Sequence, residues 1–277
     1  MNALSRLILL AVFILSTSFL IFQPKPRPTL FLIGDSTVKN GTKGQGDGGL
    51  WGWGAYIWNL VDTNKLAVQN RALGGTSSGS YAALGLWEKV LADLKPGDIL
   101  LIQFGHNDNQ RNSILDNSDS TKEVTNRRTA QKMLVHSYGW NLRKYIADAK
   151  AKGATPIVLS LVPRNIWKNG KVGRATNSYA LWAAQAAEQA GADFVDLNKI
   201  IANKYDEEGQ DAIMGRYFTA KDHVHTIAEG AKLNARCVID GLTALKKNPL
   251  APYLIKTPPV DFKAMIGDGM NFERAGE

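Results

Sequence analysis

The sequence predicts an α/β protein of three layers, in which a doubly wound, five-stranded parallel sheet is covered by helices on both faces. Two observations lead to this fold class. The expected strands are continuous apolar runs rather than alternating patterns, which is typical of strands buried on both faces. Segments with helical spacing separate these runs along most of the chain, as parallel neighbours require.

The elements follow in order along the chain, with turn residues between them. The expected strands cover residues 29–33, 66–69, 99–104, 155–162 and 192–197. The expected helices cover residues 81–94, 129–152, 178–190 and 226–246, and Gly153 and Gly191 end the second and third of these. The last helix is expected to open with a capping box formed by Thr226 and Glu229.

The chain divides into a leader, one domain and a tail. Arg6 precedes an uncharged apolar run over residues 7–22, so residues 1–23 are expected to be an export signal or an uncleaved membrane anchor. Residues 28–248 are expected to form a single domain. The proline-bearing extension, residues 249–277, is either an arm packed on that domain or a loose tail.

Charge and cysteine content restrict the possible partners. The 33 Lys and Arg residues exceed the 25 Asp and Glu residues, which gives a net charge of +8. Because the basic residues are spread along the chain rather than clustered, we expect no nucleic-acid partner; an acidic polymer, or no charged partner at all, fits better. Cys237 is the single cysteine, so no intrachain disulfide can form, and we expect a monomer.

Residues capable of acyl transfer follow the expected strands. Ser36 follows the first strand, Gly75 lies beyond the second and Asn107 follows the third, whereas Asp222 and His225 lie just before the last helix. Ligands of open α/β sheets bind outside the carboxyl ends of the strands, so these groups are expected at one edge.

Each residue type suits one part of that chemistry. A serine hydroxyl needs an adjacent base to act as a nucleophile, and His225 can be that base while Asp222 fixes its tautomer. The backbone N–H groups of Ser36 and Gly75 and the amide of Asn107 can form an oxyanion hole. Glycine at position 75 would let substrate approach the backbone closely.

The sequence resembles the GDSL or SGNH hydrolases in four ordered blocks. These blocks are Gly34-Asp35-Ser36, Gly75, Gly105-His106-Asn107-Asp108 and Asp222-x-x-His225. Within that superfamily the chain is similar to rhamnogalacturonan acetylesterases, on the further details Thr37-Val38, Asn70-x-Ala72-x-x-Gly75 and His223. The resemblance covers about residues 29–245.

The resemblance implies a flavodoxin-like sheet, no metal, no cofactor, and release of acetate from acetylated rhamnogalacturonan through an acyl-enzyme. Acetylated xylan or other small acyl esters are alternative substrates, and a noncatalytic carbohydrate-binding protein is the alternative from another class. Thr76 departs from many relatives, which carry Arg after the oxyanion glycine; this leaves the catalytic set intact and the finer substrate preference open.

Two competing assignments concern the same loops. Gly75-Thr76-Ser77-Ser78-Gly79 matches the G-x-S-x-G pattern of another hydrolase fold, which would make Ser77 the nucleophile, but no strand leads directly into it. His223 and His225, with Asp222 and Asp108, could instead ligate zinc, although no separate histidine pair with helical spacing accompanies them.

Substrate contacts are expected from four residues around this edge. Trp53 can stack on a sugar ring or lie buried under a glycine-rich connection. Arg164 can pair with a sugar carboxylate or remain solvated, and His106 and His223 are either substrate contacts or structural loop residues.

Overall fold

The computed structural model describes residues 27–41, 46–125, 130 and 132–255. The expected leader, residues 1–23, lies outside the described residues, as does the extension beyond residue 255. None of the described helices is long and apolar enough to cross a membrane.

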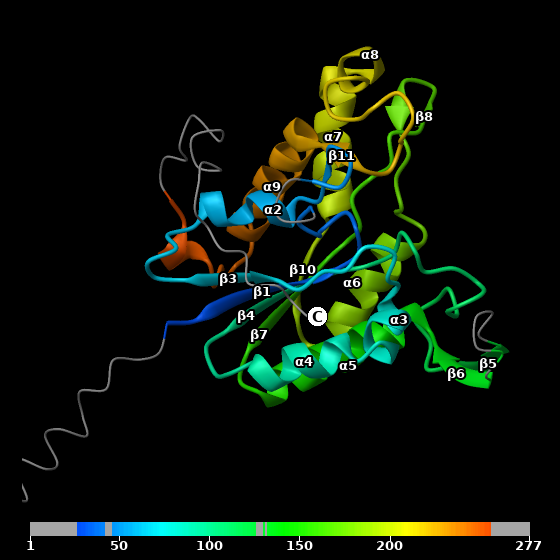
Figure 1. The fold of residues 1–277 in the computed structure, drawn as a ribbon, viewed down its shortest axis with the longest axis vertical. Coiled ribbons are helices and arrows are strands. Elements are labelled where there is room, and N and C mark those ends of the chain that lie inside the picture. Colours follow the sequence, from blue (N-terminus) through cyan, green and yellow to red (C-terminus); the bar gives the residue numbers. More distant parts are fainter. Residues whose placement is uncertain (1–26, 42–45, 126–129, 131, 256–277) are drawn as a thin grey trace, which may run out of the picture.

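The centre of the molecule is a five-stranded sheet in the order β10-β7-β4-β1-β3, with every neighbouring pair parallel (Figure 1). Its strands are β1 (Thr29–Gly34), β3 (Ala67–Asn70), β4 (Ile99–Gln103), β7 (Thr155–Leu159) and β10 (Asp193–Val195). Counted along the chain, the spatial order is 2-1-3-4-5, which is the flavodoxin-like order. The predicted fold class is therefore confirmed.

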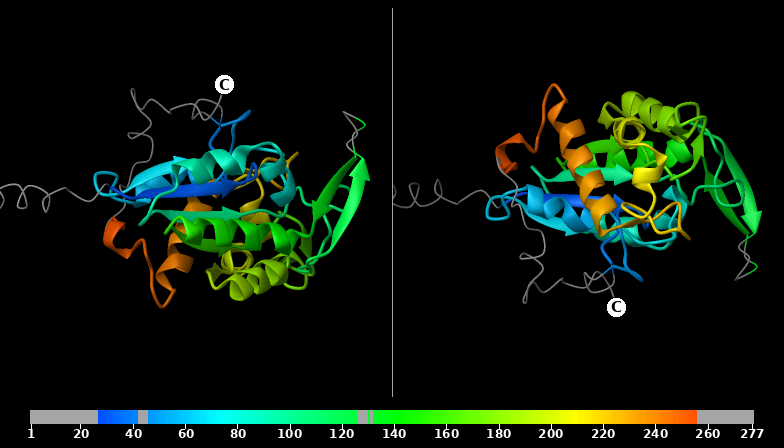
Figure 2. Two further views of the ribbon diagram at one scale, coloured as in Figure 1. Left: turned by 90° about the horizontal axis from the view of Figure 1, so that it is seen from below. Right: turned by 90° about the horizontal axis from the view of Figure 1, so that it is seen from above.

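Helices cover both faces of this sheet (Figures 1 and 2). One face carries α2 (Gly54–Ile57), α7 (Leu197–Glu208) and α9 (Ala228–Thr243); the other carries α3 (Ser78–Ala83), α4 (Leu86–Asp93), α5 (Tyr138–Ala151) and α6 (Tyr179–Ala190). Alternate residues of β1 serve the two cores: Leu30 and Leu32 pack with the first group, and Phe31 and Ile33 pack with the second. Burial on both faces explains the unbroken apolar runs.

Two predicted helices differ from the observed ones. The predicted helix 81–94 is two helices, α3 and α4, because Gly85 between them has φ of +70° and interrupts the helix. The predicted helix 129–152 is wrong in its first part. Residues Lys132–His136 form β6, which pairs antiparallel with β5 (Thr121–Thr125). The helix α5 begins at Tyr138, because Ser137 caps it by accepting a hydrogen bond from the N–H of Trp140.

The predicted capping box at Thr226 is also wrong. Thr226 and Ile227 form the short strand β11, which pairs antiparallel with β2 (Leu50–Trp51). The Thr226 hydroxyl donates to the Trp51 carbonyl over 2.9 Å instead of capping α9. This pairing fixes the segment that carries Asp222 and His225 against the segment that follows β1.

Several elements were not predicted. They are the 3₁₀ helices Trp58–Leu60 and Ala251–Tyr253, the helices α2, α7 and α8 (Gln210–Ile213), and the hairpins β5–β6 and β8–β9 (Trp167–Lys168 and Lys171–Val172). The described start of the extension packs on the domain, because the Asp62 N–H donates to the Tyr253 carbonyl and the Ile255 N–H donates to the Leu60 carbonyl.

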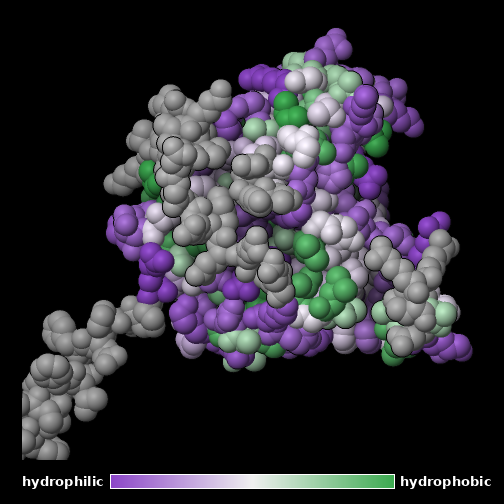
Figure 3. All heavy atoms as spheres, in the orientation of Figure 1, coloured by the Kyte–Doolittle hydropathy of each residue, from purple (hydrophilic) through white to green (hydrophobic). Residues whose placement is uncertain are grey.

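Few large apolar side chains are exposed among the described residues. Figure 3 shows hydrophilic residues over most of the visible face, with apolar residues in small separate groups. The large apolar side chains that remain exposed are Leu73, Leu84, Leu134, Ile166, Leu181 and Met214. Two of these, Ile166 and Met214, lie near the candidate site described below.

Candidate active site

Ser36 is presented by a tight turn at the end of β1. Gly34 must be glycine because a Cβ there would lie 2.4 Å from the Gln103 carbonyl oxygen of the neighbouring strand. The fully buried Asp35 carboxylate accepts hydrogen bonds from the Thr37 N–H and hydroxyl at 2.9 and 2.8 Å. These bonds hold the turn, so Ser36 is left partly exposed at the carboxyl edge of the sheet.

Three side chains form a hydrogen-bonded series at this edge. Ser36 Oγ lies 2.8 Å from His225 Nε2, and His225 Nδ1 lies 2.8 Å from Asp222 Oδ2. Because the Asp222 carboxylate can only accept, Nδ1 carries the imidazole proton, and Nε2 faces Ser36 with a lone pair. The sequence separates Ser36 from His225 by 189 positions, and the pairing of β2 with β11 helps to bring them together.

The Asp222 carboxylate is held in its charged form. Partial burial acts to raise the pKa of Asp222, but the N–H groups of His225 and Val224, together with the His225 ring, bring that pKa below its ordinary value. Oδ1 accepts from the two backbone N–H groups at 2.9 and 2.8 Å, which leaves Oδ2 for the ring. A charged Asp222 both orients the imidazole and stabilises its protonated form.

Two of the expected oxyanion groups, Gly75 and Asn107, lie on adjacent loops. Asn107 Nδ2 donates one hydrogen to the Thr76 carbonyl over 3.1 Å, and a primary amide has a second hydrogen to donate. Gly75 has φ of +79°, and a Cβ there would meet no protein atom within 4 Å. Within the protein, glycine at this position is therefore required by the backbone conformation rather than by crowding.

A buried hydrogen-bond network braces these two loops, and no sequence motif indicates it. Asp108 Oδ1 accepts from the Ser78 hydroxyl over 2.6 Å, and both carboxylate oxygens lie within reach of the Ser78 N–H. Asn141 Nδ2 also donates to Ser78 Oγ, and the Tyr179 hydroxyl donates to the Asp108 carbonyl. Burial raises the pKa of Asp108 to about 6, even though the bonds from Ser78 act in the opposite direction.

Ser77 has a structural position. Its side chain is buried and accepts a hydrogen bond from the Ser80 N–H, while the Ser80 hydroxyl accepts from the Ser77 N–H, so the pair forms the capping box of α3. No hydrogen bond to a histidine is found for Ser77 among the described contacts. The G-x-S-x-G match therefore coincides with a helix start.

The four expected substrate contacts have different environments. Trp53 is 1% exposed and its indole N–H donates to Gln103 Oε1, so the expected stacking on sugar is wrong and the buried alternative applies. Both ring nitrogens of His106 are buried, and burial lowers its pKa. Arg164 and His223 are exposed beside the triad.

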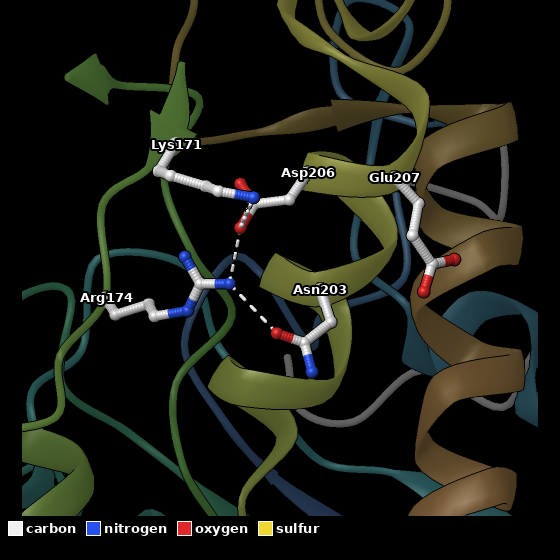
Figure 4. Close-up of a pocket in the computed structure, with 5 residues that line it drawn as sticks. All are labelled: Lys171, Arg174, Asn203, Asp206 and Glu207. Atoms are coloured by element: carbon white, nitrogen blue, oxygen red, sulfur yellow. Dashed lines mark hydrogen bonds and ion pairs between the residues drawn. The ribbon is translucent and has the colours of Figure 1, made fainter. Parts of the chain in front are cut away.

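A surface pocket away from the triad is lined by an ion-pair network that has a structural role. Figure 4 shows it between β9 and α7, where Arg174 pairs with Asp206 at 2.6 Å and Lys171 lies 3.6 Å from the same carboxylate. Burial acts to raise the pKa of Asp206, but the Val172 N–H and the Arg174 guanidinium bring it below its ordinary value. This network anchors the β8–β9 hairpin to α7.

The residues that could ligate zinc have other partners in the structure. Within the described residues, no group of three or more His, Cys, Asp and Glu side chains is arranged to hold a metal ion. His223 Nδ1 bonds instead to the Asn165 carbonyl, and Asp108 bonds to Ser78.

The chain is similar in sequence to proteins named as rhamnogalacturonan acetylesterases. A rhamnogalacturonan acetylesterase of Emericella nidulans is 32% identical over 75% of this chain and 81% of its own length. A probable rhamnogalacturonan acetylesterase of Bacillus subtilis, YesY, is 28% identical over 82% of this chain and 97% of its own length.

Solved structures show the same fold at lower identity. Bacillus subtilis YxiM has a TM-score of 0.64 at 24% identity; the match covers 80% of this chain and 57% of that one. A variant of the acetylxylan esterase Axe2 from Geobacillus stearothermophilus has a TM-score of 0.52 at 20% identity, over 77% and 93% of the two chains.

The family model described as the GDSL-like lipase/acylhydrolase family matches residues 32–233, which include Ser36, the loops of Gly75 and Asn107, and the Asp222–His225 segment. The chain belongs to this family and is a carboxylic ester hydrolase.

Proposed function

We propose that this chain is an exported serine esterase that removes acetyl groups from a plant cell-wall polysaccharide, with acetylated rhamnogalacturonan as its substrate. The observation that carries the proposal is the hydrogen-bonded series from Ser36 through His225 to Asp222. It occurs in an esterase family member whose sequence relatives are named rhamnogalacturonan acetylesterases.

The proposed reaction begins at Ser36. Nε2 of neutral His225 takes the hydroxyl proton while Oγ attacks the acetyl carbonyl carbon, and the charged Asp222 stabilises the imidazolium that forms. The tetrahedral intermediate carries its negative charge on the former carbonyl oxygen. The N–H groups of Ser36 and Gly75 and the second amide hydrogen of Asn107 are the proposed donors to that oxygen.

Collapse of the intermediate releases the sugar hydroxyl and leaves an acetyl ester on Ser36. His225 gives its proton to the departing sugar oxygen, which restores the neutral imidazole. A water molecule then loses a proton to Nε2 and attacks the acetyl-enzyme. Acetate leaves, and the proton returns to Ser36 Oγ.

The substrate and location are supported by weaker observations. The net charge of +8 favours an acidic polymer over a neutral one, and the apolar run over residues 7–22 supports export. A noncatalytic binding protein is the alternative from another class. The preserved series of Ser36, His225 and Asp222 favours the enzyme, because binding alone does not need it.

The test is acetate release from acetylated rhamnogalacturonan and, in parallel, from acetylated xylan. We expect the wild type to release acetate from the pectic polymer faster than from xylan, and Ser36→Ala to lose at least about 10³-fold in rate. Faster release from xylan would overturn the substrate. Full activity of Ser36→Ala would overturn the mechanism, and inertness of the folded wild type toward both polymers and a small acetyl ester would favour a binding protein.

A further inference from the structure

The loop after β7 lies against both halves of the candidate active site. Arg164 Nη2 lies 3.4 Å from the carbonyl oxygen of His106, next to the oxyanion residue Asn107. One residue further, the Asn165 N–H donates to the His223 carbonyl over 2.8 Å, next to Asp222. Residues 164–166 therefore form one wall of the site, from the oxyanion loop to the loop of the catalytic histidine.

Asn165 makes this wall rigid. It is 2% exposed, and its side chain accepts from the Trp167 indole over 2.7 Å and lies 3.6 Å from Met214 Sδ. Trp167 belongs to the β8–β9 hairpin, which Asp206 anchors to α7 through bonds to Arg174 and the Val172 N–H (Figure 4). The backbone from which Arg164 and Ile166 project is therefore held in place, which reduces the entropy lost when a ligand binds.

His223 displays a hydrogen-bond acceptor beside this wall. Its Nδ1 lies 3.1 Å from the Asn165 carbonyl oxygen, which can only accept, so Nδ1 carries the proton of the neutral ring. Nε2 is then an acceptor, and the residue is exposed. A sugar hydroxyl is a suitable donor to such a nitrogen, and the exposed side chains of Ile166 and Met214 nearby suit the C–H face of a sugar ring.

Arg164 adds a charge that the protein does not neutralise. Four described arginines pair with carboxylates: Arg71 with Asp93, Arg143 with Asp119, Arg174 with Asp206 and Arg216 with Glu208. Arg27 instead bonds to the Thr63 carbonyl. Within the described residues, Arg164 has no ion pair, and its side-chain hydrogen bond goes to a backbone carbonyl. A guanidinium presents a donor fork that matches a carboxylate.

We propose that Arg164, Ile166 and His223 form a subsite for a uronate residue of the polysaccharide, in which Arg164 binds the sugar carboxylate and His223 Nε2 accepts from a sugar hydroxyl. This subsite deepens the proposed function and rests on it for the identity of the polymer. Arg164 and His223 act in specificity, whereas bond breaking belongs to Ser36, His225 and Asp222.

The experiment is calorimetric titration with tetragalacturonate as the acidic probe and xylotetraose as the neutral probe. Binding of these oligosaccharides can be measured whether or not the protein deacetylates rhamnogalacturonan or xylan. We expect Arg164→Gln to weaken tetragalacturonate binding at least tenfold, which corresponds to about 1.4 kcal/mol, and xylotetraose binding less than twofold. His223→Ala should weaken both probes. Added NaCl should weaken tetragalacturonate binding to the wild type more than binding to Arg164→Gln.

The matched control is Lys152→Gln, which removes one positive charge from an exposed position just after α5, at the opposite edge of the sheet. It should bind tetragalacturonate like the wild type. No binding of tetragalacturonate by the wild type, or equal weakening by Arg164→Gln and Lys152→Gln, would overturn the subsite. Failure of the wild type to deacetylate rhamnogalacturonan would instead count against the proposed function, so the two failures are distinguishable.

Discussion

Asp222 and Asp108 are two acids beside the same site, and their environments move their pKa values in opposite directions. The Asp222 side chain is 26% exposed and accepts from two backbone N–H groups and an imidazole, which together bring its pKa below the ordinary value. Asp108 is 3% exposed, and burial raises its pKa to about 6.

The difference between these acids lies in what each carboxylate is bonded to. Asp222 interacts with a ring that becomes positive during the proposed reaction, so its own negative charge is useful there. Asp108 is bonded to the neutral Ser78 and lies under the loops of Gly75 and Asn107, so its negative charge has no described positive partner in hydrogen-bond contact. We infer that one acid serves proton transfer and that the other serves to hold the oxyanion loops.

The largest expected effect follows from neutralising Asp222. In Asp222→Asn, the amide oxygen can still accept from the N–H groups of Val224 and His225, but the amide nitrogen cannot accept the Nδ1 proton of His225. We expect kcat on 4-nitrophenyl acetate to fall by about 10³- to 10⁴-fold because the imidazole takes the wrong tautomer. A thermal melt close to that of the wild type serves as the control for folding; a loss below tenfold would remove Asp222 from the mechanism.

A smaller effect is expected from Asp108, and it concerns stability against pH. A raised pKa means that the folded protein keeps the Asp108 proton between about pH 4 and pH 6, whereas the unfolded chain loses it. The free energy of unfolding contributed by this group therefore falls as pH rises through that window, by up to about 3 kcal/mol in total. For Asp222 the lowered pKa gives the opposite slope at lower pH.

Asp108→Asn isolates this contribution, because asparagine retains an acceptor for Ser78 and does not titrate. We expect urea unfolding to show that the variant gains stability relative to the wild type as pH rises from 4 to 7. A difference in the free energy of unfolding that stays constant across this range would show that the pKa of Asp108 is not raised by burial. The pKa values of Asp108 and Asp222 would then not be shifted in opposite directions.

The buried strands of the molecule could be predicted from sequence because each is a continuous run of apolar residues. The apolar runs at residues 29–33 and 99–104 indicated buried parallel strands, and the residues after them indicated the reactive edge. The β6 strand could not be predicted, because its strand conformation depends on pairing with β5. No turn motif in the sequence indicates that pairing. Tertiary pairing likewise removed Thr226 from its expected capping role.

The rim of the site was less predictable than its centre. For Trp53 the sequence leaves both stacking on sugar and burial open, because a glycine-rich neighbourhood does not reveal that its indole bonds to Gln103 in the core. The sequence places Asp108 in the Gly-His-Asn-Asp block and offers it as a possible metal ligand, but nothing in the sequence connects it with Ser78 or Asn141. Hydrogen-bond partners far apart in sequence require the fold before they can be named.

The most direct test of the central claim is to locate the reactive nucleophile with a fluorophosphonate ester and tandem mass spectrometry. The proposal that His225 activates Ser36 predicts a single stable adduct on Ser36, formed at least about 10²-fold more slowly in His225→Ala. An adduct on Ser77 or on another residue, or undiminished labelling in His225→Ala, would contradict it.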